Sequence, residues 1–321
     1  MQNLTIEQIK NARFEVRKEP ILKPFGLSFV VADPSLLTPD LSPDGRWHMF
    51  FHTTIEGVFH FSSEDGVHFT KVQRVVKNAM RPNINKIGEK YYLFYERTRS
   101  VLANGLSVLN LAKWRSHIAV TVSDDLVHWS KPKAVITDAH GYETNERGKS
   151  ISNPFLLPVG DKFRLYFSCG LTFIPDCGFC EPTYIGYAES DSPDGGFVVA
   201  KKPVLSPDPT SEYFNLCSGC LKVYAVKDGY IGVQNGLYEN NGRSHSAILL
   251  LSSPDGLSFT VENMMVEPNE ADEKSWMHQF VYASHLVKAQ NALRLYFNAR
   301  DTADMLKGRE CIGFAEATIA E

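Results

Sequence analysis

The sequence predicts an all-β protein: a five-bladed β-propeller whose blades are four-stranded antiparallel sheets and whose ring is closed by an N-terminal strand. Three observations lead to this prediction. A short Asp-Gly-x-x-aromatic phrase recurs, a strand-hairpin-strand unit is written five times, and no convincing amphipathic helix follows Lys18. Repeats of this length are typical of radially repeated folds, so we expect residues 1–321 to form a single propeller domain.

The first repeated phrase begins at Asp65, Asp125, Asp194 and Asp255, and each copy follows a serine-containing strand end. A spacing of roughly sixty to seventy residues suits a propeller blade with long loops. The aspartate and glycine favour a tight turn, and the aromatic residue that follows is expected to fill the gap between neighbouring sheets.

The second repeated unit is an apolar strand, a short polar turn and an aromatic-rich strand, and a third strand follows each copy. Gly88, Gly160 and Gly229 lie in three of these turns, as is typical of hairpins. The last copy lacks the closing Asp-Gly-aromatic strand, so we expect residues 20–31 to supply the missing outer strand. A β-sandwich is the competing fold, but it would not predict five similar blade-sized copies.

Composition excludes some classes of partner. The chain has 321 residues, of which 43% are hydrophobic and 12% aromatic, enough for a substantial core. The formal net charge is -4 without a block of like charge, which argues against nucleic acid or a membrane as partner. The first residues lack a signal-peptide pattern and no stretch is apolar enough to span a bilayer, so we expect a cytoplasmic protein with reduced cysteines. The oligomeric state stays open.

The repeat predicts where a pocket lies, because innermost strands begin at the propeller axis and the loops after the second strands return to the same face. The strand starts supply Asp33, Arg81, Asn83, Asn153, the segment from Cys217 to Cys220, and the segment from Tyr282 to His285. The returning loops supply His52, Glu96, Arg97, the segment from Cys177 to Glu181, Gln234, Asn235, Arg300 and Asp301. Burying so many polar groups without partners is costly, so they predict a wet, ligand-binding cavity; interblade salt bridges are the alternative.

The segment Ala32-Asp33-Pro34, followed by a hairpin and an aromatic strand, resembles the start of glycoside hydrolase family 43 and its five-bladed relatives. The resemblance covers nearly the whole chain as a repeat pattern. It implies that Asp33 is the general base of an inverting glycosidase, which activates a water on one face of the sugar while an acid protonates the leaving oxygen. The alternative for Asp33 is an Asp-Pro turn at a strand entry.

Two other carboxylates implied by the resemblance do not match. Asn153 stands where the third blade should open with an aspartate, and the fourth blade opens with LCSGCLKV, which has no carboxylate. The acid must then come from elsewhere or the chemistry differs. Glu96 is the first substitute and Glu181 the second, with Glu143 and Glu146 as weaker options; each is otherwise a solvated loop glutamate.

The predicted substrate is a mono- or oligosaccharide, a furanoside or xyloside such as an arabinofuranoside, galactofuranoside or xyloside. Hydrolysis of this kind requires no cofactor. The predicted substrate-binding residues are Arg81, Asn83, Asn153, Gln234, His278, His285 and Arg300. Trp276, Tyr282 and Phe173 are weaker predictions as stacking surfaces for a sugar ring, since aromatic residues are more often packed between blades.

Four cysteines form two C-x-x-C pairs, Cys177 with Cys180 and Cys217 with Cys220. The repeat places both pairs on the pocket face of adjacent blades, which predicts a zinc site, with Cys169 as a further ligand. The alternative is a group of buried thiols that pack as small hydrophobic side chains.

Two rival functions stay open. The missing carboxylates favour a non-hydrolytic carbohydrate-binding propeller. A phosphorylase-like relative would need a basic cluster for phosphate, for which Arg81, Arg97 and Arg300 are available.

Overall fold

The structure, a computed structural model, describes residues 1–304 and 307–319 and consists almost entirely of β-strands. These residues contain five four-stranded sheets, and neighbouring strands within each of them are antiparallel. The prediction of an all-β fold with four-stranded antiparallel sheets is therefore confirmed.

The strands are given sheet by sheet. The first sheet is β2 (Ala32–Leu37), β3 (Trp47–Thr53), β4 (Gly57–Ser63) and β5 (Thr70–Val76). The second is β6 (Ala79–Ile87), β7 (Lys90–Arg97), β9 (His117–Ser123) and β10 (Lys133–Ile136). The third is β13 (Ile151–Val159), β14 (Lys162–Cys169), β17 (Tyr184–Ser190) and β18 (Val198–Val199). The fourth is β19 (Cys217–Val226), β20 (Gly229–Asn240), β21 (Arg243–Ser253) and β22 (Thr260–Val266). The fifth is β23 (Phe280–Ala289), β24 (Ala292–Arg300), β25 (Glu310–Thr318) and β1 (Glu15–Val16).

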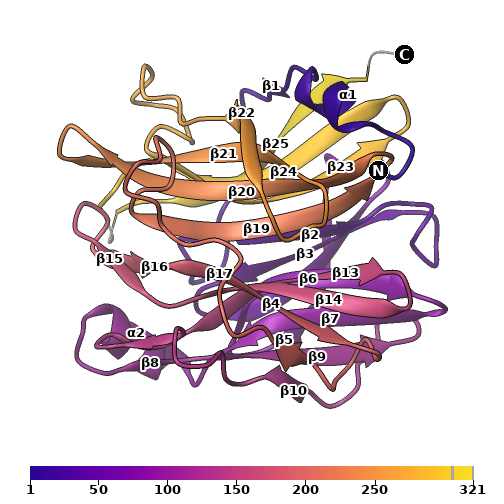
Figure 1. Ribbon diagram of the computed structural model, residues 1–321, viewed down its shortest axis with the longest axis horizontal. Helices are drawn as coiled ribbons and strands as arrows, with labels where there is room; N and C mark the ends of the chain where they lie inside the picture. Colours follow the sequence, from indigo (N-terminus) through magenta and orange to yellow (C-terminus); the bar gives the residue numbers. More distant parts are fainter. Residues whose placement is uncertain (305–306, 320–321) are drawn as a thin grey trace.

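Smaller elements connect these sheets. They are α1 (Ile6–Lys10), α2 (Val101–Val108), the short strands β8 (Trp114–Arg115), β11 (Thr144–Asn145) and β12 (Gly148–Lys149), and the hairpin β15 (Thr172–Ile174) and β16 (Phe179–Glu181). Figure 1 shows α2, β8, β15 and β16 at the same side of the molecule, on the left. In the described part of the chain, no helix is long and apolar enough to cross a lipid bilayer.

Hydrogen bonds link the first strands of the five sheets to one another. In four of them a side chain of one strand accepts a backbone N–H of another, and in the remaining one a backbone carbonyl accepts from a lysine. The acceptor and donor pairs are Ser35 Oγ with Ile84 N (3.0 Å), Asn83 Oδ1 with Leu156 N (2.9 Å), Pro154 O with Lys222 Nζ (3.5 Å), Tyr224 Oη with Leu286 N (2.9 Å), and His285 Nδ1 with Leu36 N (2.9 Å). The fifth pair joins the last sheet to the first, so β2, β6, β13, β19 and β23 surround a common centre.

Aromatic side chains fill the spaces between neighbouring sheets. Phe50 of the first sheet is buried with Leu93 and Tyr95 of the second, and Trp129 packs edge-on to Phe50 at 5.9 Å between ring centroids. Full burial of one such side chain contributes about 1.5–3 kcal/mol. Trp129 closes a copy of the repeated turn phrase, so its predicted role between sheets is confirmed.

The repeated phrase forms a turn held by its aspartate. Asp65 Oδ1 accepts hydrogen bonds from Val67 N at 2.8 Å and His68 N at 2.9 Å. Asp125 and Asp255 accept the corresponding pairs. A short carboxylate side chain that binds the backbone two and three residues later is typical of an Asx turn, as the sequence pattern indicates.

Two predictions about secondary structure were wrong. Residues 20–31 do not form the outer strand of the last sheet; β1 pairs with β25 instead, and the predicted segment makes only isolated bridges at Leu22 and Val30. Figure 1 shows α1 and β1 beside the C-terminal strands. A second helix, α2, follows Ser100, whose side chain accepts a hydrogen bond from Ala103 N. No side chain of α2 is buried, so it has no apolar stripe facing a core to mark it in the sequence.

Candidate active site

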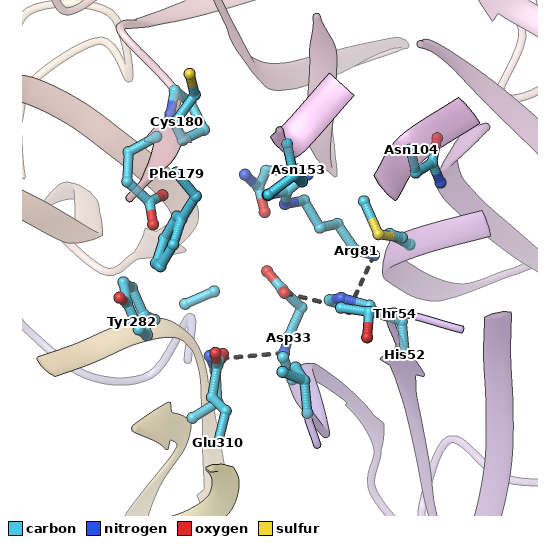
Figure 2. A pocket seen from close by; sticks show the side chains of 18 of the residues that line it. Asp33, His52, Thr54, Arg81, Asn104, Asn153, Phe179, Cys180, Tyr282 and Glu310 are labelled. Atoms are coloured by element: carbon cyan, nitrogen blue, oxygen red, sulfur yellow. Dashed lines mark hydrogen bonds and ion pairs between the residues drawn. The ribbon is translucent and has the colours of Figure 1, made fainter. Parts of the chain in front are cut away.

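A cavity of about 460 Å³ lies where the first strands of all five sheets begin. Residues from every sheet line it, together with α2 and the β15–β16 hairpin. This size is within the range of about 300–1,000 Å³ that small-molecule sites occupy. In Figure 2, Asp33 points into the space between Arg81, Tyr282 and Glu310, with Phe179 and Tyr282 on one side and His52 on the other.

A β-bulge at the start of each first strand aims side chains at the cavity. The pairing register shifts between Ala32 and Ser35, Met80 and Asn83, Ser152 and Phe155, Cys217 and Cys220, and Val281 and Ser284. Inside four of these bulges lie residues with positive φ: Asp33 (55°), Arg81 (53°), Asn153 (45°) and Gly219 (61°). All four line the cavity. Bulges that redirect a side chain are frequent next to active sites, and positive φ at non-glycine residues is uncommon.

Asp33 is held from two sides. Its backbone N–H donates to Asn298 Oδ1 at 3.0 Å, and its Oδ2 lies 3.3 Å from His52 Nδ1. Burial raises the pKa of the Asp33 carboxyl above its ordinary value, and the positive charges of Arg81 and Lys222 oppose this rise. Burial lowers the pKa of His52 to about 3, so His52 is neutral at pH 7.

Arg81 is bound by Glu96, which does not line the cavity. Arg81 Nη1 donates to Glu96 Oε2, and Trp114 Nε1 donates to Glu96 Oε1 at 3.2 Å. The Glu96 side chain is fully buried. The prediction that Glu96 is the acid is not supported, because its side chain turns from the strand end towards Arg81 and is occupied there. Glu96 instead orients the guanidinium that does line the cavity.

Glu181 lies at the end of β16 and lines the cavity. Among the described residues, no hydrogen bond or ion pair to its carboxyl is found. Burial raises the pKa of Glu181 to about 8; Arg81 opposes this rise, while the carboxyls of Glu310 and Asp33 add to it. A carboxyl with this pKa is mostly protonated at pH 7 and can donate a proton.

Glu310 opens β25 and was not identified from the sequence. Its Oε1 accepts from Asn298 Nδ2, and its Oε2 lies 3.7 Å from Arg300 Nη1. Burial raises the pKa of Glu310 to about 7; Arg300 opposes this rise and Asp33 adds to it. The repeat could have indicated Glu310, because this residue follows the loop after the second strand of the last copy. The corresponding loops of the other copies supplied candidates such as His52 and Glu96.

Three predicted substrate-binding residues line the cavity: Arg81, Asn153 and Arg300. The Oδ1 atom of Asn153 is buried without a hydrogen-bond partner, so it is available to a donor on a ligand. The Arg300 guanidinium also donates to the carbonyls of Thr302 and Asp304 at 2.9 and 3.0 Å, which fixes its orientation.

The other predicted binding residues lie outside the cavity lining. Asn83 and His285 lie deeper, where they accept the backbone N–H groups of Leu156 and Leu36. Gln234 is buried and donates to Ser218 O at 3.0 Å. His278 is near Asn269 O, at 3.3 Å, in the loop before β23. For Asn83 and His285 the bulges change which residue of the strand faces the axis, and for Gln234 the alternation of side chains along a strand places Asn235 at the cavity instead.

The stacking predictions have mixed outcomes. Tyr282 lines the cavity. Trp276 stacks on Phe297 at 5.4 Å between ring centroids and packs over Gly313, outside the cavity lining. Phe173 is also outside that lining and has Arg147 above its ring, 4.3 Å from the centroid. Phe179, which the sequence did not single out, is a further aromatic residue of the lining.

The structure does not support a zinc site. Among the residues described, no group of three or more His, Cys, Asp or Glu side chains is arranged to hold a metal ion. Cys177 and Cys217 pack with Ile174, Leu237 and Phe280, while Cys180 and Cys220 face the cavity. All four are free, and burial raises the pKa of each thiol, Cys220 to about 11. Three of these thiols are buried, and that of Cys180 is partly buried.

The fold is similar to that of several solved structures. The structure is similar to an N-acetylgalactosamine deacetylase from F. plautii in complex with blood group B trisaccharide, with a TM-score of 0.66, 13% identity, and coverage of 96% of this chain and 95% of the other. It is similar to the alpha-L-arabinofuranosidase of Podospora anserina in complex with cellotriose, with a TM-score of 0.64, 15% identity, and coverage of 96% and 98%. It is also similar to a family 117 glycoside hydrolase of Zobellia galactanivorans, with a TM-score of 0.63, 15% identity, and coverage of 96% and 91%.

The chain thus has the propeller-type fold of glycoside hydrolases, which confirms the resemblance seen in the sequence at the level of fold. No protein-family model matches the sequence, and no curated protein matches it.

Proposed function

We propose that this protein is a glycoside hydrolase with Asp33 as general base and Glu181 as general acid. The observation that carries the proposal is the pair of carboxyls in one cavity with different surroundings. Asp33 is fixed by Asn298 and faces two cations, whereas Glu181 has a pKa of about 8 and no described partner. Environments that separate the protonation of two carboxyls are typical of an acid and a base that work together.

The reaction we propose is a single displacement. Asp33 takes a proton from water, whose oxygen attacks the anomeric carbon; the bond from that carbon to the leaving oxygen breaks, and Glu181 gives its proton to the leaving oxygen. Inversion of the anomeric centre follows. The expected check is NMR of the first-formed sugar, which should have the opposite anomeric configuration to the substrate; the same configuration would contradict this step.

We propose a furanoside or xyloside as substrate, with sugar hydroxyls bound by Arg81, Asn153 and Arg300. The unpartnered Asn153 Oδ1 supports a hydroxyl donor at that position. The similarity in fold to an alpha-L-arabinofuranosidase supports the sugar class.

We also propose that the five sheets are the blades of one propeller over residues 1–321 and that β1 completes the last blade and closes the ring. The pairing of Glu15 and Val16 with Glu316 and Ala315 supports this closure. The hydrogen bond from Leu36 N to His285 Nδ1, which joins the first and last sheets near the axis, supports a single unit.

The two rival functions have less support. A phosphorylase-like reaction needs an uncompensated positive charge for phosphate, but the charges of Arg81 and Arg300 are paired with the carboxyls of Glu96 and Glu310. A purely binding function was favoured by the missing acid in the fourth blade, and Glu181 supplies an acid from the neighbouring hairpin.

A screen of aryl furanosides and pyranosides, with and without phosphate, tests the proposal. We expect hydrolysis that is independent of phosphate. Asp33→Asn should lose at least about 10²-fold in kcat on any substrate, and Glu181→Gln should lose as much on substrates whose leaving group needs protonation. Glu146→Gln, which changes an exposed loop glutamate in the same way, is the matched control and should retain activity. Sugar binding without turnover in the unchanged protein would overturn the proposal.

A further inference from the structure

Arg147 is the arginine of the described cavity lining whose charge no carboxyl neutralises. The lining contains three arginines. Arg81 pairs with Glu96, and Arg300 Nη1 lies 3.7 Å from Glu310 Oε2. For the guanidinium of Arg147, the described part of the chain supplies neither an ion pair nor a hydrogen-bond acceptor. Charges on a protein and its ligand are usually complementary, so an unpaired cation in a binding cavity favours an anion on the ligand.

The structure holds Arg147 at the edge of the cavity, in the turn between β11 and β12. Its backbone N–H donates to Asn145 Oδ1 at 2.9 Å, and its carbonyl accepts from Trp114 N at 3.0 Å. The guanidinium lies over the ring of Phe173, with Cζ 4.3 Å from the centroid. Phe173 is 38% exposed and is not part of the lining, so the guanidinium lies between the cavity and the protein surface. Stacking on a ring leaves the N–H groups at the edge of a guanidinium available to a ligand.

The segment that borders this side of the cavity is basic, although the whole chain has a net charge of -4. Residues 97–123, which include α2 and β8, contain no Asp or Glu. Their four lysine and arginine side chains are Arg97, Arg99, Lys113 and Arg115. Within the described structure none of the four forms an ion pair with a carboxyl. Because α2 and Trp114 of this segment line the cavity, the local excess of positive charge attracts anions towards it.

From this charge distribution we infer that the substrate is an acidic saccharide, in which a carboxylate binds the guanidinium of Arg147. The inference rests on the proposed function, because it adds a charged group to the substrate of the same site. A planar guanidinium donates two parallel hydrogen bonds to one carboxylate, a geometry that a single neutral hydroxyl does not match. Since Arg147 lies at the edge of the cavity, the carboxylate belongs to a uronic acid linked to the sugar that is hydrolysed.

The position of Arg147 favours this substituent over phosphate as a co-substrate. Phosphate that attacks an anomeric carbon would lie beside Asp33. Burial raises the pKa of Asp33, and the cations that oppose this rise are Arg81 and Lys222. Burial also raises the pKa of the Cys180 thiol, and there Arg147 is the cation that opposes the rise. Arg147 therefore holds an anion that takes no part in the displacement.

The test uses pairs of oligosaccharides that differ only in their acidic group. The acidic members are a xylotetraose that carries one glucuronic acid and an α-L-arabinofuranosyl glucuronic acid; in their neutral partners the carboxyl is reduced to an alcohol. Titration calorimetry in the Glu181→Gln background gives dissociation constants without turnover. We expect the acidic member of at least one pair to bind about tenfold more tightly. Acidic members that bind no more tightly than their partners in both pairs, undetectable binding included, would overturn the inference.

A third pair, a xylotetraose with and without one sulfate group, tests the kind of anion. A sulfate carries the charge but is tetrahedral, whereas the proposed ligand is planar. We expect the sulfated member to gain less than the better of the two carboxylates. A preference for the sulfate alone would overturn the assignment of a uronic acid.

Variants assign the preference to Arg147. Arg147→Gln should reduce the preference for the acidic member to within about twofold and leave binding of the neutral member unchanged. Arg147→Lys should keep part of the preference, because lysine retains the charge without the planar fork. Arg115→Gln removes an exposed charge from neighbouring β8, outside the lining, and is the matched control that should keep the preference. Circular dichroism melting checks that all three fold. Equal losses in Arg115→Gln and Arg147→Gln would overturn the inference, because a general field would then explain the preference.

The two proposals fail separately. Hydrolysis of acidic and neutral members at equal kcat/KM would contradict the acidic substrate and leave the glycosidase proposal standing. Tighter binding of the acidic member, lost in Arg147→Gln, with no hydrolysis of any glycoside by the unchanged protein would contradict the glycosidase proposal while supporting the carboxylate site.

Discussion

The side-chain amide of Asn298 fixes Asp33, since its Oδ1 accepts the Asp33 backbone N–H at 3.0 Å. The same amide donates to Glu310 through Nδ2. One buried side chain from the fifth sheet therefore positions the proposed base, which belongs to the first sheet, and a second carboxyl of the cavity. Because Asp33 has a positive φ of 55°, the hydrogen bond also holds a backbone conformation that is uncommon for aspartate.

Replacement of Asn298 by Ala should lower kcat by about 10–100-fold, because small misplacements of a catalytic group are costly. KM should change less than kcat, since the change does not remove a proposed sugar ligand. Steady-state kinetics on the best substrate of the screen gives both values. An unchanged kcat would show that Asp33 does not depend on this bond.

The pH dependence of stability should reveal the raised pKa of Glu181. Its pKa is about 8 in the folded protein, above the ordinary 4.5, so the folded state binds more protons than the unfolded state between these values. The contribution of the protonated Glu181 carboxyl to the free energy of unfolding is fully present below pH 4.5 and is lost as the pH rises through 8. Glu181→Gln should therefore raise Tm by several degrees at pH 8.5 and change it little at pH 5. An equal shift at both pH values would contradict the raised pKa.

Glu96→Gln tests whether Glu96 acts as the acid or only holds Arg81. We expect kcat to stay within about tenfold of the unchanged protein, because the acid contributes about 10²–10⁴-fold and Glu96 does not reach the cavity. Arg81→Met should lower the free energy of unfolding more than Glu96→Gln does, by about 3–5 kcal/mol, because it leaves the buried charge of Glu96 without a partner. Urea denaturation measures the second effect. A kcat for Glu96→Gln as low as that of Glu181→Gln would restore Glu96 as the acid.

The bulge of the fourth sheet depends on Gly219. A Cβ atom there would lie 2.0 Å from Asn235 O, and φ is +61°. We expect Gly219→Ala to lower the free energy of unfolding by about 2–4 kcal/mol, measured by urea denaturation. Gly105→Ala is the matched control, because Gly105 is helical with open space around it, and it should be neutral or stabilising by up to about 1 kcal/mol.

Much of the fold could be predicted because each blade repeats its own turn chemistry. Asp65, Asp125 and Asp255 mark turns whose hydrogen bonds are local and therefore readable from sequence. Helix α2 was missed because none of its side chains is buried, so no apolar periodicity distinguishes it. The closing strand was misplaced because a two-residue strand such as Glu15–Val16 leaves almost no pattern.

The site was predicted in part. Asp33, Arg81 and Asn153 each precede a proline at a strand start, and that position places them in a bulge that faces the cavity. Glu96 and Gln234 were assigned to the site from their place at the edge of a strand. Which way such side chains turn depends on partners from other segments, Arg81 and Ser218 here, which no local pattern contains.

The dependence of rate on leaving group in Glu181→Ala tests the central claim most directly. If Glu181 is the acid, a 2,4-dinitrophenyl glycoside, which needs no protonation, should keep a kcat within about tenfold of the unchanged protein. An alkyl glycoside of the same sugar, which does need it, should lose about 10²–10⁴-fold. Equal losses for both leaving groups, or no loss for either, would contradict the assignment of Glu181 and with it the acid–base pair in this cavity.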